Sequence, residues 1–319
     1  MSDVEIVSGG ETRGHGPNHF AGGAIDRATV RRADPDWVAD SRSHPEARVV
    51  PVWRSRSLLS SLEDDGQGYD PVFLSPRAAR GYVEGEKEWL FLGLDADKPI
   101  FAARVIGDGE APPDPFPTLG EFLDLHRVGA LLRQSEGALL AYARAVTTWS
   151  IRHRFCGRCG HETHPTDGGH VRRCSNELCE TQHFPRTDPA IIVLVEDGDR
   201  CLLGRKDIWP EGVYSTLAGF VEPGESLSEA VVREVREESG IDVGEVRYRS
   251  SQPWPFPSSL MLGFHAVRMG GELRPDGDEL EDARWFHRDD FARRREIGLR
   301  LPSRVSIARR LIQEWLDGV

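Results

Sequence analysis

The stretch GFVEPGESLSEAVVREVREESGI, residues Gly219–Ile241, decides the fold of the second half of the chain. Its Pro223-Gly224 pair predicts a turn, because proline fixes one backbone angle and glycine accepts the left-handed region. Ser226 or Ser228 can then cap a helix, since a serine hydroxyl accepts hydrogen bonds from the first free amides of a helix. The stretch therefore predicts a glycine-containing turn followed by a helix over about 226–239.

One face of this helix is apolar. Its small and branched apolar residues recur at helical spacing, at Leu227, Ala230, Val231 and Val235. Such a stripe is typical of a helix that packs on a sheet. Gly240 follows the last helical residue, where glycine commonly ends a helix.

Three carboxylates share another face of the same helix. Glu234, Glu237 and Glu238 stand at positions i, i+3 and i+4, so their side chains are neighbours. Their charges repel one another, and Arg233 and Arg236 offset only part of that repulsion. Oxygen ligands at this density suit Mg²⁺ or Mn²⁺, which also bind phosphate oxygens. The alternative is a solvated acidic face interspersed with arginine.

The whole stretch resembles the Nudix box and matches it at every fixed position. These positions are Gly219, Glu225, Arg233, Glu234, Val235, Glu237, Glu238, Gly240 and Ile241. This resemblance implies an α/β fold, an αβα sandwich around a mixed sheet. It also implies a metal-dependent hydrolase that cleaves nucleoside diphosphates linked to another group. By position, Glu234 and Glu238 would be the main ligands of the catalytic metal, and Glu237 would assist as ligand or base. Ala218 would contribute its carbonyl and Glu279 a further carboxylate.

Four of the five cysteines fall within a short segment, at Cys156, Cys159, Cys174 and Cys179. Two short loops, each bounded by a cysteine pair, can supply four thiolates to one tetrahedral Zn²⁺, and four protein ligands leave no open position. The segment therefore predicts a structural zinc site. Buried free thiols are the alternative, as is one histidine in place of a cysteine, from among His161, His164, His170 and His183. Cys201 stands apart, and we expect it in the core.

The sequence SQPWPFPSS, residues 251–259, begins ten residues after the helix motif. Three prolines and two aromatic residues make a stiff loop that suits a planar base and a ribose. An ordinary proline-rich connection is the alternative. The loop resembles the signature of the NADH pyrophosphatase subfamily, in which a zinc ribbon and a Nudix-like N-terminal domain precede the Nudix domain. The residues expected to line the substrate pocket are Gln252, Pro253, Trp254, Pro255, Phe256, Pro257, Ser258 and Ser259.

The subfamily resemblance implies hydrolysis of NADH or NAD to AMP and nicotinamide mononucleotide, a homodimer, catalytic Mg²⁺ or Mn²⁺, and removal of NAD caps from RNA. It also implies four further substrate contacts, at Arg133, Phe184, Phe220 and Ala308. Gly169 stands where the subfamily has an acid, which removes one polar contact. The alternatives are another Nudix substrate, such as ADP-ribose or a dinucleoside polyphosphate, or a nucleic-acid-binding zinc-ribbon protein with an inert Nudix fold.

The rest of the chain divides by composition. We expect an arm over 1–30, a Nudix-like domain over 31–150, a zinc ribbon over 151–186 and the catalytic Nudix domain over 187–319. The expected strands cover 48–57, 89–105 with a turn at 95–99, 190–195 paired with 201–204, 244–252 and 260–269. The expected helices cover 119–127, 136–150 and 303–317.

Composition limits the possible functions. The formal net charge of −12 argues against a large nucleic-acid-binding face, because such faces are rich in Lys and Arg. No apolar run approaches the roughly 18 residues of a membrane span, and the N-terminal residues lack the pattern of a signal peptide. We therefore expect a cytoplasmic protein without a membrane partner.

Overall fold

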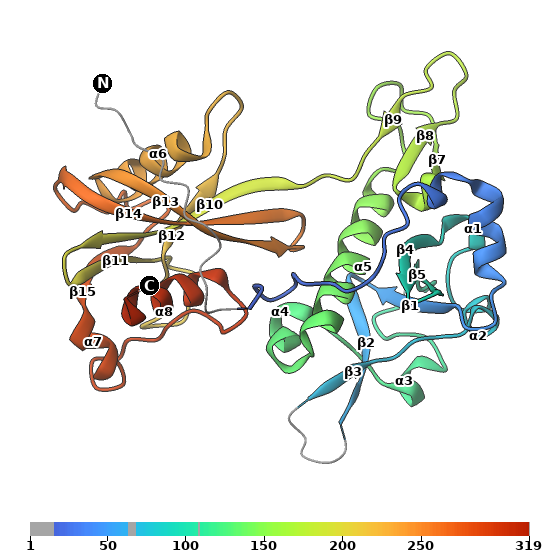
Figure 1. Ribbon diagram of the computed structural model, residues 1–319, viewed down its shortest axis with the longest axis horizontal. Coiled ribbons are helices and arrows are strands. Elements are labelled where there is room, and N and C mark those ends of the chain that lie inside the picture. The colour runs from blue at the N-terminus through green and yellow to red at the C-terminus, as the bar shows by residue number, and fades with distance from the viewer. Residues whose placement is uncertain (1–15, 63–67, 108, 319) are drawn as a thin grey trace. The chain divides into compact units, whose positions relative to one another are not determined.

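The computed structural model describes residues 16–62, 68–107 and 109–318. The chain forms two compact units (Figure 1). Unit 1 contains residues 188–253 and 259–318, together with 16–18, and unit 2 contains residues 19–187 and 254–258. Among the described residues, no helix combines the length and the apolar character that crossing a membrane requires.

Unit 1 is built on a six-stranded mixed sheet with the order β13-β14-β10-β11-β15, in which β12 also pairs with β10. Strands β10 and β14 are parallel over nine residue pairs, whereas β11 and β12 run antiparallel to β10. The strands are β10 (Asp188–Asp197), β11 (Arg200–Arg205), β12 (Leu217–Phe220), β13 (Ile241–Trp254), β14 (Ser259–Gly271) and β15 (Asp282–His287). The expected mixed sheet is confirmed.

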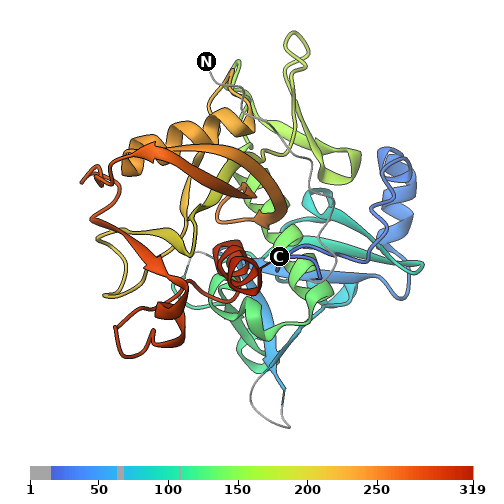
Figure 2. The same ribbon diagram turned by 60° about the vertical axis from the view of Figure 1, so that its left-hand side comes forward.

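Helices cover both faces of this sheet. The continuous apolar run of β10 sends Ile191, Val193 and Val195 to the core shared with α6 (Leu227–Ser239). The intervening residues Ile192 and Leu194 belong to the core shared with α7 (Arg288–Ala292) and α8 (Ile307–Asp317). A strand buried on both faces needs no alternation of apolar and polar residues, which explains the run. The result is the expected αβα sandwich, with α6 and α8 on opposite sides of the sheet (Figures 1 and 2).

Unit 2 has a second six-stranded sheet, with the order β3-β2-β1-β5-β4 and β6 paired to β2. Its longest helix, α5 (Gln134–Arg152), packs on this sheet and buries ten residues. The strands are β1 (Arg48–Trp53), β2 (Arg56–Ser61), β3 (Tyr69–Pro71), β4 (Leu90–Asp95), β5 (Lys98–Arg104) and β6 (Glu121–Leu123). The short helices are α1 (Pro35–Arg42), α2 (Pro76–Ala79), α3 (Phe116–Leu119) and α4 (Leu125–Val128).

A three-stranded sheet of β7 (Thr163–Thr166), β8 (Val171–Cys174) and β9 (Gln182–His183) completes unit 2. It lies within the cysteine-rich segment, and β8 ends at Cys174. The sheet therefore positions Cys174 directly, and the other three cysteines lie in the segments that flank its strands.

Two expected elements are wrong. The strand expected over 48–57 is a hairpin, because Arg54 and Ser55 take positive φ angles of 47° and 60° and reverse the chain between β1 and β2. The helix expected over 119–127 is interrupted by β6, which pairs with β2. Gly120 permits this pairing, since a Cβ atom there would lie 2.3 Å from the carbonyl oxygen of Leu59.

Part of the expected arm over 1–30 lies outside the described residues, which begin at residue 16. In the described part, Phe20 is buried and its ring packs on Trp254 and Phe256, with centroids 6.2 and 5.8 Å away. Asp26 forms a backbone bridge with Leu94. These contacts hold residues 20–26 against the rest of unit 2.

Candidate functional site

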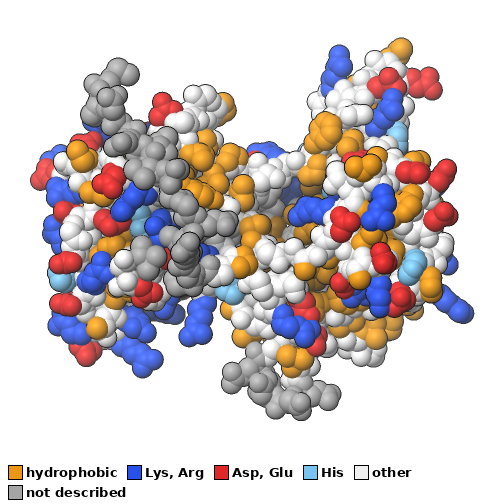
Figure 3. Space-filling view, viewed as in Figure 1, with side chains coloured by type: hydrophobic (Ala, Val, Ile, Leu, Met, Phe, Trp, Pro, Cys, Tyr) orange, Lys and Arg blue, Asp and Glu red, His pale blue; other side chains and the backbone are white. Residues whose placement is uncertain are grey.

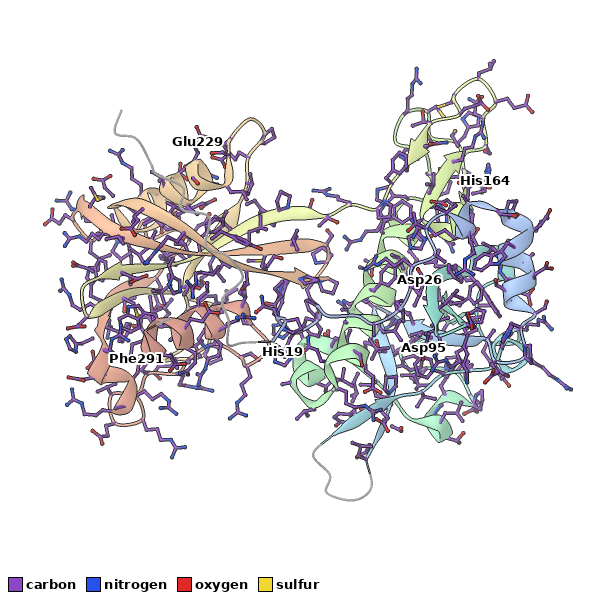
Figure 4. All side chains as sticks on the ribbon, viewed as in Figure 1. His19, Asp26, Asp95, His164, Glu229 and Phe291 are labelled. Carbon is purple, nitrogen blue, oxygen red and sulfur yellow. The ribbon has the colours of Figure 1, made fainter. Side chains whose placement is uncertain are left out.

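Helix α6 starts and ends as its sequence predicts. The Ser226 hydroxyl accepts a hydrogen bond from the Glu229 amide, and the Glu229 carboxylate accepts one from the Ser226 amide, so Ser226 is the cap (Figure 4). Gly240 ends the helix with φ at 72°. The predicted apolar face is buried at Ala230, Val231 and Val235, whereas Leu227, the first helical residue, is exposed and lies outside it.

The three carboxylates of α6 differ in burial. Glu234 and Glu238 are buried, with 9% and 3% of their surface exposed. The side chain of Glu237 is 62% exposed. The structure therefore divides the cluster into two buried carboxylates and one that faces solvent.

Glu238 is the most perturbed acid of the site. Burial raises the pKa of Glu238 to about 8, and the negative charges of Glu234, Glu279 and Asp276 add to the effect against the opposing charge of Lys206. Its Oε2 atom is buried and has no hydrogen-bond partner among the described residues. A buried carboxylate without a partner is costly unless a cation or proton compensates it. Glu238 thus has one oxygen available for a cation.

Glu234 sits directly against the backbone of β12. A Cβ atom on Gly219 would lie 1.9 Å from the Glu234 carboxyl carbon, so only glycine leaves room for this carboxylate. Burial raises the pKa of Glu234, and Arg233 opposes that rise. The preceding residue, Ala218, pairs with Ile192 in the sheet and therefore has a fixed backbone position beside the carboxylate.

Arg233 holds the turn and the carboxylates together. Its Nε and Nη2 atoms donate to the two oxygens of Glu225 at 3.0 and 2.6 Å. Its Nη1 donates to Glu234 at 2.9 Å and to Glu237 at 3.0 Å, and Nη2 also donates to the Phe220 carbonyl. A guanidinium has five N–H donors, and all five are used here. The sequence suggested only charge compensation for Arg233 and missed this positioning role.

Lys206 and Glu279 extend the site beyond α6. The Lys206 ammonium lies 3.3 Å from a Glu279 oxygen, and both groups influence the pKa of Glu238. The structure thus places Glu279 within electrostatic reach of the two buried carboxylates. No local sequence signal marks Lys206. It directly follows β11, and Glu279 lies in the segment after β14, so only the fold brings the two residues together.

These residues fit a divalent cation. Carboxylate oxygens are the donors that Mg²⁺ and Mn²⁺ prefer. Such an ion would use the Oε2 atom of Glu238, which has no partner among the described residues, and the Glu234 carboxylate that packs against Gly219. The carboxylates do not form a closed ligand group. Among the described residues, the one such group is the set of four cysteines.

The four cysteines form the predicted cluster, and their Sγ atoms all lie within 4.8 Å of one another. Backbone and side-chain donors surround the sulfurs. The Asn176 amide lies 3.4 Å from the Cys174 sulfur, and the His183 Nε2 lies 3.4 Å from the Cys156 sulfur. Hydrogen bonds with Thr181 lower the pKa of Cys179 to about 6, whereas burial raises the pKa of Cys174 to about 12. Cys201 is buried in the core, as expected.

The predicted substrate residues of unit 1 include two with structural roles. The Gln252 amide group donates to the Val305 carbonyl at 2.7 Å and accepts from the Ile307 amide at 2.8 Å, so it holds the start of α8. Ala308 is fully buried, and its amide donates to the Ser306 hydroxyl. Phe220, by contrast, is 60% exposed at the end of β12. Its ring is available for stacking.

The remaining predicted substrate residues lie in unit 2, apart from Pro253 and Ser259 in unit 1. Trp254 and Phe256 pack on each other with ring centroids 5.1 Å apart, and Arg144 donates to the Pro255 carbonyl at 2.7 Å. Phe184 is 61% exposed. Arg133 is exposed and bonds Asp70 and Glu136. The structure therefore does not gather all predicted substrate residues within one unit.

Three domain families match the chain. Residues 46–149 match the NADH pyrophosphatase-like rudimentary NUDIX domain, residues 151–184 the NADH pyrophosphatase zinc ribbon domain, and residues 185–306 the NUDIX domain. The matches follow one another along the chain in the order that the sequence predicted.

Several curated proteins are similar to the chain over long segments. An NAD-capped RNA hydrolase of Stutzerimonas stutzeri is 52% identical over 178 residues, and the match spans 56% of this chain and 61% of that protein. One of Macaca fascicularis is 35% identical over 94% of this chain and 73% of its own length. One of Pseudomonas aeruginosa is 42% identical over 72% of this chain and 81% of its own length.

Proposed function

We propose, from the premise that the chain belongs to the Nudix hydrolases that carry an NADH pyrophosphatase zinc ribbon, that it hydrolyses the pyrophosphate bond of NADH, NAD and NAD-capped RNA. The products would be nicotinamide mononucleotide together with AMP or a 5′-monophosphate RNA. The observation that carries the proposal is the buried Glu238 carboxyl, whose free oxygen lies in the same site as Glu234.

Glu234, Glu238 and Glu279 would hold one or more Mg²⁺ or Mn²⁺ ions, with the Ala218 carbonyl as a further ligand. A bound divalent cation neutralises phosphate charge and lowers the pKa of water. Mg²⁺ and Mn²⁺ suit the same oxygen donors, so we propose that either ion supports the reaction.

The chain's own residues would orient the substrate and move one proton. We assign the acceptance of a proton from the attacking water to Glu237 or Glu238. Glu237 is suited by exposure, and the Arg233 guanidinium holds one of its oxygens at 3.0 Å. Glu238 is suited by position, since its carboxyl lies inside the site, and its pKa of about 8 makes its carboxylate form a stronger base than that of an ordinary glutamate. Attack in line with the leaving group would then separate the two mononucleotides.

Aromatic rings would hold the bases of the substrate. Phe220 and Phe184 are exposed and can stack on a base, and Trp254 and Phe256 form a packed aromatic pair in the proline-rich loop. Arg133 would contact a phosphate. We also propose that the pocket includes Gln252, Pro253, Pro255, Pro257, Ser258, Ser259 and Ala308. Gln252 would act through the backbone that it holds in place, and Ala308 through its own backbone.

The cysteine cluster would hold one structural Zn²⁺ per chain, through Cys156, Cys159, Cys174 and Cys179. We propose domain limits at 30, 150 and 186, a homodimer and a cytoplasmic location, as the sequence predicted.

A substrate panel tests the proposal. Purified protein with Mg²⁺ or Mn²⁺ is incubated with NADH, NAD, ADP-ribose, a dinucleoside polyphosphate and NAD-capped RNA, and products are separated by chromatography. We expect nicotinamide mononucleotide from the first two and from the capped RNA, and faster turnover of these three than of the others. A clear preference for ADP-ribose or the polyphosphate would contradict the proposed substrate. Absence of any turnover with either metal would contradict the proposed reaction.

A further inference from the structure

An arginine-rich segment stands out in this acidic chain. Residues 293–310 contain seven arginines and one acidic residue, Glu296, although the whole chain has a net charge of −12. The segment runs from the end of α7 to the first turn of α8, within unit 1. Figure 3 shows Lys and Arg side chains gathered over this end of unit 1. The local charge is therefore opposite to that of the protein as a whole.

The fold anchors the segment that carries these arginines. Phe291 packs its ring against Trp315 of α8, at a centroid distance of 5.7 Å (Figure 4). Leu299 and Ile307 are buried in the same core cluster. The Arg300 amide donates to the Gly212 carbonyl at 2.8 Å, which fixes the loop between the two helices. Of the seven arginines, Arg294, Arg309 and Arg310 are half-buried and the other four are exposed.

Most of these arginines have no acidic partner. Arg293 pairs with Asp290 and Arg310 pairs with Glu314. Within 16–62, 68–107 and 109–318, no ion pair joins an acid to any of the remaining five, which are Arg294, Arg295, Arg300, Arg304 and Arg309. An unpaired guanidinium keeps its donors for an external anion.

Arg309 lies within electrostatic reach of two other arginines of the segment, Arg294 and Arg304. The pKa of Arg309 is lowered by partial burial and then by the positive charges of Arg294 and Arg304, and no acid opposes these effects. Arg294 is half-buried and anchored by a bond from its Nη1 to the Phe291 carbonyl. A cluster of like charges held together by the fold is unfavourable unless an anion occupies it.

We propose that Arg294, Arg304 and Arg309 form a docking surface for the phosphodiester backbone of an RNA whose capped 5′ end occupies the carboxylate site. The inference rests on the proposed function, and it assigns the RNA body, rather than a free dinucleotide, to this surface. Guanidinium groups bind phosphate oxygens strongly and without reading the bases. The surface therefore serves RNAs of many sequences.

The position of the surface determines which RNAs use it. The arginines border the α8 face of the sheet, whereas the carboxylates belong to α6 on the opposite face. A capped RNA must pass around the edge of the sheet to reach both. A long RNA can do so with the phosphodiester groups beyond its cap, which free NADH lacks. The surface should therefore affect long capped RNAs alone.

The test compares two variants with equal loss of charge. The first carries Arg294→Gln, Arg304→Gln and Arg309→Gln. The second carries Arg77→Gln, Arg80→Gln and Arg274→Gln, which remove three exposed arginines elsewhere. For each, kcat/KM is measured on free NADH, on a long NAD-capped RNA and on the same RNA trimmed to its first nucleotides. Binding of the long RNA is measured over a range of salt concentrations.

We expect the first variant to lose roughly 10- to 100-fold in kcat/KM on the long RNA at low salt, and to lower the slope of log affinity against log salt by about 2, since each single-strand phosphate contact contributes about 0.7. Its turnover of NADH and of the trimmed RNA should equal that of the second variant. Unchanged values on the long RNA would overturn the inference, as would equal losses in both variants. Arg304→Glu alone, at an exposed position, repeats the test if the triple variant unfolds. If the unmodified protein does not hydrolyse NADH, that result would count against the proposed function instead.

Discussion

Replacement of Gly219 by alanine should disable the candidate site through a single atom. The added Cβ would lie 1.9 Å from the Glu234 carboxyl carbon and 2.0 Å from its Oε1. Carbon atoms in contact prefer about 3.5 to 4.0 Å, so the carboxylate must retreat by roughly 1.6 Å or more. A misplacement of about 1 Å in a catalytic group costs on the order of a hundredfold in rate, or about 2.7 kcal/mol. We therefore expect kcat/KM on NADH to fall by about a hundredfold or more.

The fold should survive this change. Gly219 lies in β12, its backbone needs no positive φ, and the three atoms nearest to an added Cβ all belong to the Glu234 carboxylate. Gly270→Ala is the matched control, because a Cβ there meets only the Asp242 carboxylate at an ordinary 4.0 Å. The assay is steady-state hydrolysis of NADH at increasing Mn²⁺, together with thermal unfolding. The steric reasoning would be refuted by a Gly219→Ala protein that keeps more than about a tenth of its activity and an unchanged Mn²⁺ requirement.

Three further predictions concern other groups. Glu238→Gln should reduce turnover more than about tenfold without lowering the melting temperature of the metal-free protein, because it removes a buried carboxyl that lacks a partner; a marked fall in that temperature would argue for a structural role. Burial, Arg32 and Arg27 lower the pKa of His170 to about 4, so the unfolded chain takes up a proton first as pH falls from about 6.5. The free energy of unfolding should then drop by up to about 3 kcal/mol between pH 6.5 and 4 and stay level above that window. Urea titrations should show this slope in the unmodified protein and not in His170→Gln. Removal of zinc by a chelator, or Cys174→Ser, should lower the melting temperature of unit 2; an unchanged melting curve with the metal shown to be gone would exclude a structural zinc.

Sequence signals of short range predicted much of the fold. Helix α6 was predictable because its cap, its apolar stripe and its final glycine all lie within one stretch, and the structure confirms each except Leu227 at the first helical position. The paired strands β10 and β11 were predictable from an apolar run and an acidic turn. Local patterns succeed where the element contains its own start, face and end.

Elements that depend on distant partners were not predictable. Strand β6 contains only Glu121–Leu123 and exists because Gly120 lets the chain approach Leu59 on β2. Strand β12 has only four residues and pairs with the middle of β10. Segments of three or four residues carry too little pattern of their own, so the pairing strand decides their conformation.

The candidate site shows the same division. The spacing of Glu234, Glu237 and Glu238 correctly indicated a shared helical face, but it could not show that one of the three is exposed and two are buried. The substrate prediction for Gln252 rested on resemblance, and the structure adds a role in anchoring α8. No sequence signal predicted that Lys206 belongs to the site, because Glu279, its partner in the ion pair, is distant from it in the chain.

All five N–H donors of Arg233 are used, and this restricts which other residues can replace it. Lysine offers three hydrogens on one nitrogen, so at least two of the five oxygen contacts would lose their donor, and a point charge cannot bridge the turn and the helix at once. Arg233→Lys would therefore preserve the charge but loosen the hydrogen bonds that position Glu234 and Glu237. The Arg233 side chain also has no free N–H group to donate to the phosphate of a substrate. A bound nucleotide must therefore contact other cationic groups.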